Sequence, residues 1–125
     1  MAEINSFCWN ELNAKDAAAC KKFYSAVFGW TAHDQAFGPM VYTIFKKGEQ
    51  QVAGMLQMTA EWGDIKPHWM PYISVDDCDA YAKKITENGG KVCVPPTDIS
   101  VGRFAVVEDP NGGFFSIIRL TAPPG

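Results

Sequence analysis

Apolar and polar residues follow two different periods along the chain, and each change of period marks a new element. Residues 5–12 alternate one by one, which is typical of a strand and places Trp9 and Glu11 on the same face. From Asp16 to Gly29 the apolar positions are three or four residues apart, which predicts an amphipathic helix. An aspartate at the start complements the helix dipole, and a glycine at the end adopts a left-handed cap at little cost.

The same order of elements recurs 61 residues later. Asp77 stands where Asp16 begins the first helix, and Gly90 stands where Gly29 ends it. A period this long in so short a chain indicates two copies of one supersecondary unit, here aligned without a gap.

Each copy is predicted to contain a strand, a helix and three further strands. In the first copy the later strands are expected at residues 30–34, 41–46 and 51–57. In the second copy the elements are expected at 69–75, 77–88 (helix), 91–95, 102–108 and 113–119. The predicted fold class is α+β, with two βαβββ modules whose curved sheets face each other around a cleft and whose helices lie outside.

We expect one domain over residues 1–125. Its parts are predicted to be a first module at about 4–57, a link at 58–67, a second module at about 68–120 and a frayed tail at 121–125.

Composition excludes several classes of function. The formal net charge is −3 and no run of basic residues occurs, so the charge pattern of a nucleic-acid binder is missing. No window approaches the ~20 apolar residues that a membrane span needs. The expected partners are therefore a small-molecule ligand or a second copy of the chain.

The four cysteines form no CxxC pair, and Cys20 and Cys78 fall on the apolar faces of the two predicted helices. They are expected to be reduced core residues. Because the N-terminus also lacks the features of a secretory signal, we expect a cytoplasmic protein.

Three segments resemble a known superfamily. They are AACKKFYSAVFGW at 18–30, Val75-Asp-Asp, and FAVVEDPNGGFFS at 104–116. Together with the order of elements, they resemble the vicinal oxygen chelate superfamily. That superfamily contains glyoxalase I, extradiol dioxygenases, and bleomycin and fosfomycin resistance proteins. The resemblance covers nearly the whole chain and implies a single glyoxalase/bleomycin resistance-like domain.

The resemblance also implies four positions for the ligands of a divalent metal. They are typically a histidine seven residues before each helix-opening aspartate and a glutamate on the last strand of each copy. In this chain those positions hold Trp9, Met70, Met55 and Ser116. Indole and thioether do not replace imidazole or carboxylate, and a serine hydroxyl alone is a poor ligand. We therefore expect no cofactor and an aromatic, largely apolar cleft.

Two polar residues leave alternatives open. His68 could hold a metal together with Glu11 and waters, contact a substrate, or simply be hydrogen-bonded or solvated near the rim of the cleft. Glu11 points toward the cleft, where it could bind a ligand or act as a general base. It could equally pair with Arg103, Arg119 or a backbone amide as part of the sheet.

Strand parity adds two more side chains to the predicted cleft face, because Tyr72 alternates with Met70 and Phe114 with Ser116. The complete set of predicted ligand-binding residues is Trp9, Glu11, Met55, Met70, Tyr72, Phe114 and Ser116. The alternative is that these apolar side chains fill a core between two tightly closed sheets.

Two classes of function follow. The first is a metal-free protein that sequesters or senses a planar or apolar small molecule. The alternative is a glyoxalase-like lyase or isomerase, either metal-dependent or using Glu11 as general base. Since many proteins of the resembling superfamily are dimers, the resemblance also implies a possible homodimer.

Overall fold

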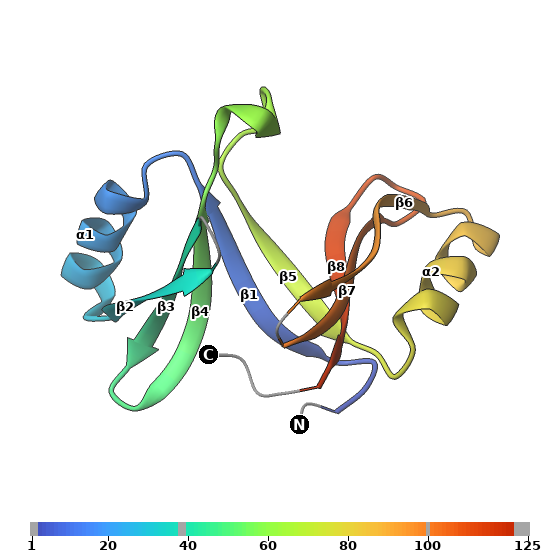
Figure 1. Ribbon diagram of the computed structural model, residues 1–125, viewed down its shortest axis with the longest axis horizontal. Helices are drawn as coiled ribbons and strands as arrows, with labels where there is room; N and C mark the ends of the chain where they lie inside the picture. The colour runs from blue at the N-terminus through green and yellow to red at the C-terminus, as the bar shows by residue number, and fades with distance from the viewer. Residues whose placement is uncertain (1–2, 38–39, 100, 122–125) are drawn as a thin grey trace. The chain divides into compact units, whose positions relative to one another are not determined.

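The computed structural model describes residues 3–37, 40–99 and 101–121, so the predicted tail lies almost entirely outside the described residues. The elements in chain order are β1 (Phe7–Ala14), α1 (Ala17–Phe28), β2 (Thr31–Phe37), β3 (Met40–Lys47), β4 (Gln50–Gln57), a 3-10 turn (Ala60–Trp62), β5 (His68–Ser74), α2 (Cys78–Glu87), β6 (Lys91–Ile99), β7 (Gly102–Glu108) and β8 (Phe114–Leu120) (Figure 1). The α+β fold class with two βαβββ copies is confirmed. Neither helix of the described segments is long and apolar enough to cross a bilayer.

Contacts divide the chain into two compact units, which are described separately. Residues 9–69 form the first unit, and residues 3–8 together with 70–121 form the second.

Both helices begin in the way the sequence predicts. The Oδ1 atom of Asp16 accepts a hydrogen bond of 3.0 Å from the amide of Ala19, and Asp77 caps α2 through Ala80 at the same distance. These bonds satisfy amides that have no partner within the helix. Gly29 ends α1 in the left-handed conformation, with φ of 71°.

The second helix ends at Glu87, two residues before the end that the 61-residue repeat predicts from Phe28 of α1. The left-handed glycine after α2 is Gly89, with φ of 90°, and not Gly90. A glycine is favoured at position 90 for a different reason. A Cβ there would come within 2.6 Å of the carbonyl oxygen of Glu108 and of the Ile85 side chain.

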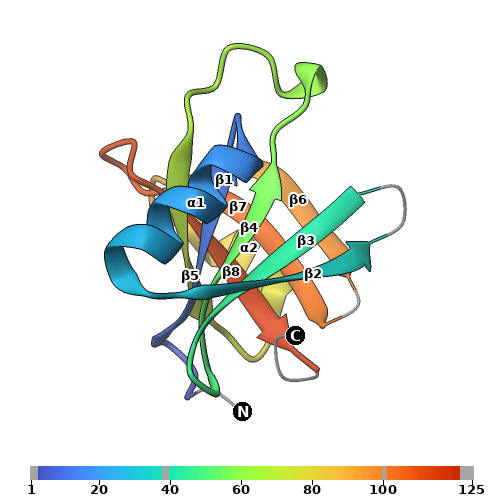
Figure 2. The same ribbon diagram turned by 90° about the vertical axis from the view of Figure 1, so that its left-hand side faces the viewer.

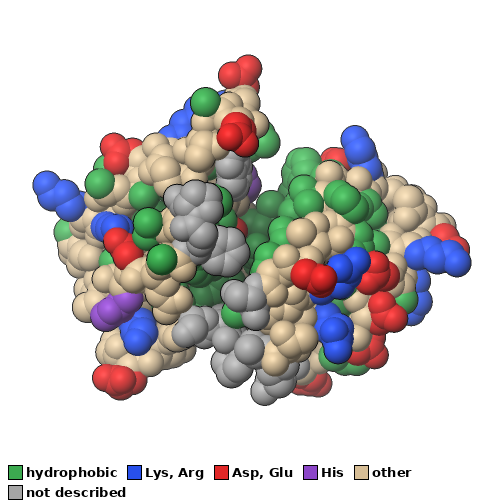
Figure 3. Space-filling model, viewed as in Figure 1, with side chains coloured by type: hydrophobic (Ala, Val, Ile, Leu, Met, Phe, Trp, Pro, Cys, Tyr) green, Lys and Arg blue, Asp and Glu red, His purple; other side chains and the backbone are tan. Residues whose placement is uncertain are grey.

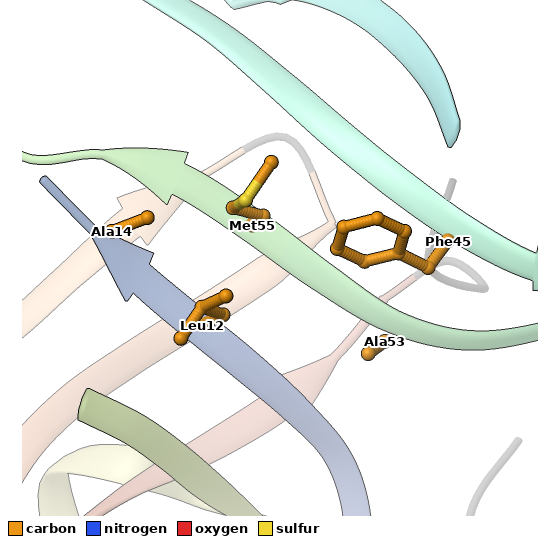
Figure 4. Packing of buried hydrophobic residues seen from close by; sticks show 5 residues of the cluster. All are labelled: Leu12, Ala14, Phe45, Ala53 and Met55. Carbon is orange, nitrogen blue, oxygen red and sulfur yellow. The ribbon is translucent and has the colours of Figure 1, made fainter. Parts of the chain in front are cut away.

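In the first unit the strands run in the order β2-β3-β4-β1, with β1 parallel to β4 and the other pairs antiparallel. Helix α1 covers one face of this sheet (Figure 2). Under the helix lies a cluster of buried apolar side chains from three strands (Figure 4), namely Leu12, Ala14, Phe45, Ala53 and Met55. Cys20 and Tyr24 of α1 pack against this cluster.

In the second unit the order is β5-β8-β7-β6, with β5 parallel to β8. The buried cluster that packs with α2 consists of Val75, Cys78, Ala105, Val107 and Ile117. The N-terminal segment belongs to this unit, since the amide of Asn5 donates to the carbonyl of Ser74 at 2.6 Å.

The two copies do not keep one offset along their whole length. Leu12 of β1 lies beside Met55, whereas Ile73 of β5 lies beside Ile117. The first strands are thus related by 61 residues and the last strands by 62, so the alignment without a gap is wrong beyond the helices.

The extra residues enter in β6. This strand has two register shifts against β7, one between Val92 and Val94 and one between Val94 and Thr97, while β2 pairs with β3 without any. The second shift contains Pro95 and Pro96. Proline donates no ladder hydrogen bond and is tolerated at bulges and on outer strands, and β6 is the outermost strand of its sheet.

Candidate functional site

In the first unit, the sheet face opposite α1 carries the polar and aromatic residues of β1. Trp9, Glu11 and Asn13 alternate with Leu12 and Ala14, which pack in the core under the helix. Glu11 is 8% exposed and Asn13 3% exposed, so both polar side chains are buried. Parity therefore predicts the face of Trp9 and Glu11 correctly, and their role in ligand binding stays a prediction.

The same face carries an aromatic pair that the sequence did not reveal. The Nε1–H of Trp9 donates a hydrogen bond of 2.9 Å to the hydroxyl of Tyr42 on β3. The Tyr42 ring lies directly over Gly54 of β4, because a Cβ on that glycine would overlap the tyrosine hydroxyl and ring. Gly54 is in turn the neighbour of Glu11 in the β1–β4 pairing. A glycine inside a strand is a signal of close approach, and here it indicates the place of Tyr42.

Met55 does not lie on this face, which corrects its predicted place among the ligand-binding residues. It pairs with Leu12 across β1 and β4 and is buried in the cluster under α1, 1% exposed. Because of the one-residue offset on the last strands, the residue of the first unit that corresponds to Ser116 is Gly54.

His68 is hydrogen-bonded within the first unit. Its Nδ1 lies 2.7 Å from the carbonyl oxygen of Lys66, and its Nε2 lies 3.2 Å from Nδ2 of Asn13. Of the alternatives for His68, the hydrogen-bonded one is therefore observed, with a partly exposed side chain, and a role toward a metal or substrate stays a prediction. The other end of the Asn13 carboxamide, Oδ1, is buried and has no hydrogen-bond partner in the parts of the chain that the structure describes.

In the second unit, the face opposite α2 carries the other predicted residues. Tyr72 of β5 lies beside Ser116 of β8, and both are buried, as is Met70. Ser116 is completely buried, and its Oγ finds no hydrogen-bond partner among the described residues. Phe114 shares the parity of Ser116 but is 55% exposed. Parity is therefore correct for these four, and their contact with a ligand stays a prediction.

The four positions at which the resembling enzymes hold a metal do not fit a divalent ion in this chain. With the corrected register they are occupied by Trp9, Met70, Gly54 and Ser116. None of these offers an imidazole or a carboxylate, which are the ligands that hard and borderline divalent metals require. Residues 3–37, 40–99 and 101–121 contain no group of three or more His, Cys, Asp or Glu side chains that could hold a metal.

Arg103 was one proposed partner of Glu11, but its ion pairs lie within the second unit. It bonds Asp79 at 2.8 Å and Asp98 at 3.0 Å. These bonds raise the pKa of Arg103, and the guanidinium lowers the pKa of Asp79. They lie beside an open pocket of about 360 Å³ whose lining residues are Asp76, Asp77, Cys78, Asp79, Arg103 and Arg119.

The arrangement of elements and the matches to known proteins define the class. A family model described as the Glyoxalase/Bleomycin resistance protein/Dioxygenase superfamily matches residues 4–117, and the chain belongs to this superfamily. It is 37% identical over 119 residues to the putative glyoxylase CFP32 of Mycobacterium tuberculosis, which is 94% of this chain and 45% of the relative. It is 33% identical over 112 residues to the anthracycline biosynthesis protein DnrV of Streptomyces peucetius, which is 90% of this chain and 40% of the relative. The chain thus spans less than half the length of these curated relatives.

Solved structures agree on the fold. A variant of Streptomyces coelicolor methylmalonyl-CoA epimerase in complex with 2-nitronate-propionyl-CoA matches with a TM-score of 0.69, covering 96% of this chain and 100% of that one. A complex of methylmalonyl-CoA epimerase with methylmalonyl-CoA and NH4+ matches with a TM-score of 0.67, covering 97% and 100%. The sequence identities are 17% and 16%, so these matches concern the fold alone.

Proposed function

We propose that the chain is a small-molecule binding protein of the glyoxalase/bleomycin resistance type that holds a planar or apolar ligand without a metal. The observation that carries this proposal is the hydrogen-bonded pair of Trp9 and Tyr42 over Gly54. These residues replace potential metal ligands with flat aromatic surface. Small-molecule sites typically combine such apolar surface with a few polar groups, which Glu11 and Asn13 supply here.

The relatives support an organic ligand. One is named for anthracycline biosynthesis, and the epimerase structures hold CoA esters. We propose that the face of the second unit opposite α2 also offers ligand-binding side chains, namely Met70, Tyr72, Phe114 and Ser116. The four free cysteines support a cytoplasmic location.

A titration with a planar aromatic probe tests this proposal. Purified protein is assayed for metal, treated with EDTA, and titrated with 2-naphthol by fluorescence anisotropy before and after treatment. We expect the same affinity for 2-naphthol before and after EDTA treatment. In Trp9→Ala the affinity should fall by about tenfold or more, since stacked aromatic contacts contribute ~1 kcal/mol beyond burial. Trp69→Phe is the control, because Trp69 packs on Tyr24. A stoichiometric metal whose removal abolishes binding would contradict the proposal.

The alternative is catalysis with Glu11 as general base, and its buried position on the Trp9 face favours it. The measurement is exchange of the acidic proton of methylmalonyl-CoA into D2O. An enzyme would catalyse this exchange, and Glu11→Gln would lower the rate by about 10²–10⁴-fold. If the probe binds tightly and no exchange above background is measured, the result would contradict catalysis by Glu11 and retain the binding function.

We also propose a homodimer formed through the outer face of α1. Phe23, Val27 and Phe28 are each 56% exposed on this helix, and together they offer roughly 300 Å² of apolar area. Such an area suits the centre of an interface of about 800 Å² per partner. At the position of Phe23, the second helix has Lys84 instead.

The side chains visible over the two helices differ in kind in the space-filling view (Figure 3). Apolar side chains lie among charged ones over α1, on the left, and charged side chains predominate over α2, on the right.

A further inference from the structure

The buried carboxamide of Asn13 carries an unsatisfied oxygen, which no other buried side chain does among the described residues of the first unit. The residue is 3% exposed, and its Oδ1 has no hydrogen-bond partner among the residues described. A buried acceptor that gives up its water without gaining a donor destabilises the ligand-free protein. Such groups in native structures call for an explanation.

The orientation of this carboxamide follows from the histidine beside it. A carbonyl oxygen can only accept, so the Nδ1 of His68, 2.7 Å from the Lys66 carbonyl, must carry a proton. In the neutral ring Nε2 is then an acceptor, and only the amide nitrogen of Asn13 can donate to it across 3.2 Å. The Lys66 carbonyl thus determines which nitrogen of His68 carries the proton, and this tautomer determines the orientation of the Asn13 carboxamide. Oδ1 of Asn13 is therefore turned away from the histidine.

The position of Oδ1 on the sheet places it on the face where we propose that the ligand binds. Asn13 shares the face of β1 with Trp9 and Glu11, opposite the helix-covered core. A ligand that stacks on the Tyr42 ring, which lies over Gly54, is therefore on the same sheet face as the amide oxygen of Asn13. A buried acceptor favours hydroxyl and N–H groups and disfavours anions, whose oxygens cannot donate a hydrogen bond.

We propose that Oδ1 of Asn13 accepts a hydrogen bond from a hydroxyl or N–H group of the ligand, and that the site selects neutral aromatic donors such as phenols. His68 is a positioning residue, which keeps the acceptor turned toward the ligand. This inference rests on the proposed function and adds the chemical class of the ligand.

The test compares two probes that differ only in the donor. The affinities of 2-naphthol and 2-methoxynaphthalene are measured at pH 7.5 by fluorescence anisotropy, with 2-naphthoate as the anionic comparison. We expect the naphthol to bind about tenfold more tightly than its methyl ether, which corresponds to about 1.4 kcal/mol, and the naphthoate to bind most weakly. In Asn13→Leu, which keeps a similar volume, the preference for the naphthol should vanish while the methyl ether binds at least as well as before.

A second measurement requires no ligand. Nitrogen-15 chemical shifts of the His68 ring report which nitrogen carries the proton, and we expect the Nδ1–H tautomer at pH 7.5. A ring protonated at Nε2 would place Oδ1 of Asn13 against the histidine and overturn the inference, even if Asn13→Leu fails to fold.

The outcomes separate the two proposals. Binding of both naphthalenes with equal affinity in the wild type overturns the role of Asn13 but leaves the aromatic site intact. Absence of binding by all three probes overturns the aromatic site and this inference with it. A preference for the naphthol that persists in Asn13→Leu also counts against Asn13.

Discussion

Gly54 shows how one missing side chain can organise a face of a sheet. Its Cα lies between Glu11 on β1 and Ile44 on β3, and the space that a Cβ would occupy is filled by Tyr42. The glycine thereby sets where the tyrosine hydroxyl lies, and with it the bond from Trp9.

Gly54→Ala is therefore expected to destabilise the protein by about 1–3 kcal/mol, since the added methyl group must push the Tyr42 ring from its place. Urea unfolding measures this as a shift of the midpoint at constant slope. The control is the same substitution in a Tyr42→Ala background, where the methyl group has room and should cost far less. Equal costs in both backgrounds would show that the tyrosine is not the obstacle.

Cys78 provides a pH-dependent test. Its side chain is 1% exposed, and burial, followed by the charge of Asp79, raises its pKa to about 11 from 9.0. The folded protein keeps the thiol proton that the unfolded chain loses. This contribution to stability is complete below pH 9 and is lost as the pH rises through about 11.

We expect the free energy of unfolding to fall between pH 9 and 11, and to fall less steeply in Cys78→Ala. Alkylation by iodoacetamide at pH 9 gives a second readout, because only thiolates react. Exposed Cys93 should be modified first and Cys78 last. Rapid modification of Cys78 in the folded protein would contradict this placement.

Much of the site at this scale was predictable from parity. Alternation along β1 was sufficient to place Trp9 and Glu11 opposite the helix. Alternation along β5 and β8 placed Tyr72 and Ser116 in the same way. The place of Met55 was not predictable, because it depends on the register of a parallel pair, and sequence spacing does not determine register once a bulge intervenes.

At the scale of elements, the two helix caps are the best-defined signals in the chain. Asp16 and Asp77 each accept an amide hydrogen bond from the third residue beyond them. Asp16→Ala and Asp77→Ala should each destabilise the protein by about 1 kcal/mol, as is typical for loss of an N-cap. Thermal unfolding measures both, and Asp16→Asn should retain most of the stability because its side-chain oxygen still accepts. Asp76→Ala is the control, since the cap of α2 is the next residue, and a similar loss there would argue against capping as the cause.

The strands show where sequence patterns stop being sufficient. Each predicted strand exists, because alternation and turn residues bound it locally. The register shifts of β6 are set by how two prolines fit against β7, which is a contact between strands and leaves no period in the sequence. The alignment of the repeat was therefore correct up to the helices and failed after them.

At the scale of the whole molecule, the duplication supplies an internal comparison. Each helix packs one of its faces against a sheet, so packing constrains the residues on both inner faces in the same way. The residues on the outer faces are free to differ. The outer face of α1 exposes Phe23, Val27 and Phe28, while α2 presents Lys84 where α1 has Phe23. Burial in the single chain does not account for this difference, because half of each aromatic surface remains in water.

A dimer that contacts through α1 does account for it, and Phe23→Lys tests the idea. The substitution copies the residue of the second helix onto the first, so the helix should tolerate it and the fold should persist by circular dichroism. We expect the wild type to be a dimer in size-exclusion chromatography with light scattering, and Phe23→Lys to be a monomer, because a charge at the centre of an apolar contact must be desolvated without a partner. Lys84→Glu, on the other helix, should leave the mass unchanged. A wild type that is monomeric at 100 μM, or a Phe23→Lys protein that stays dimeric, would show that this apolar face does not form the dimer contact.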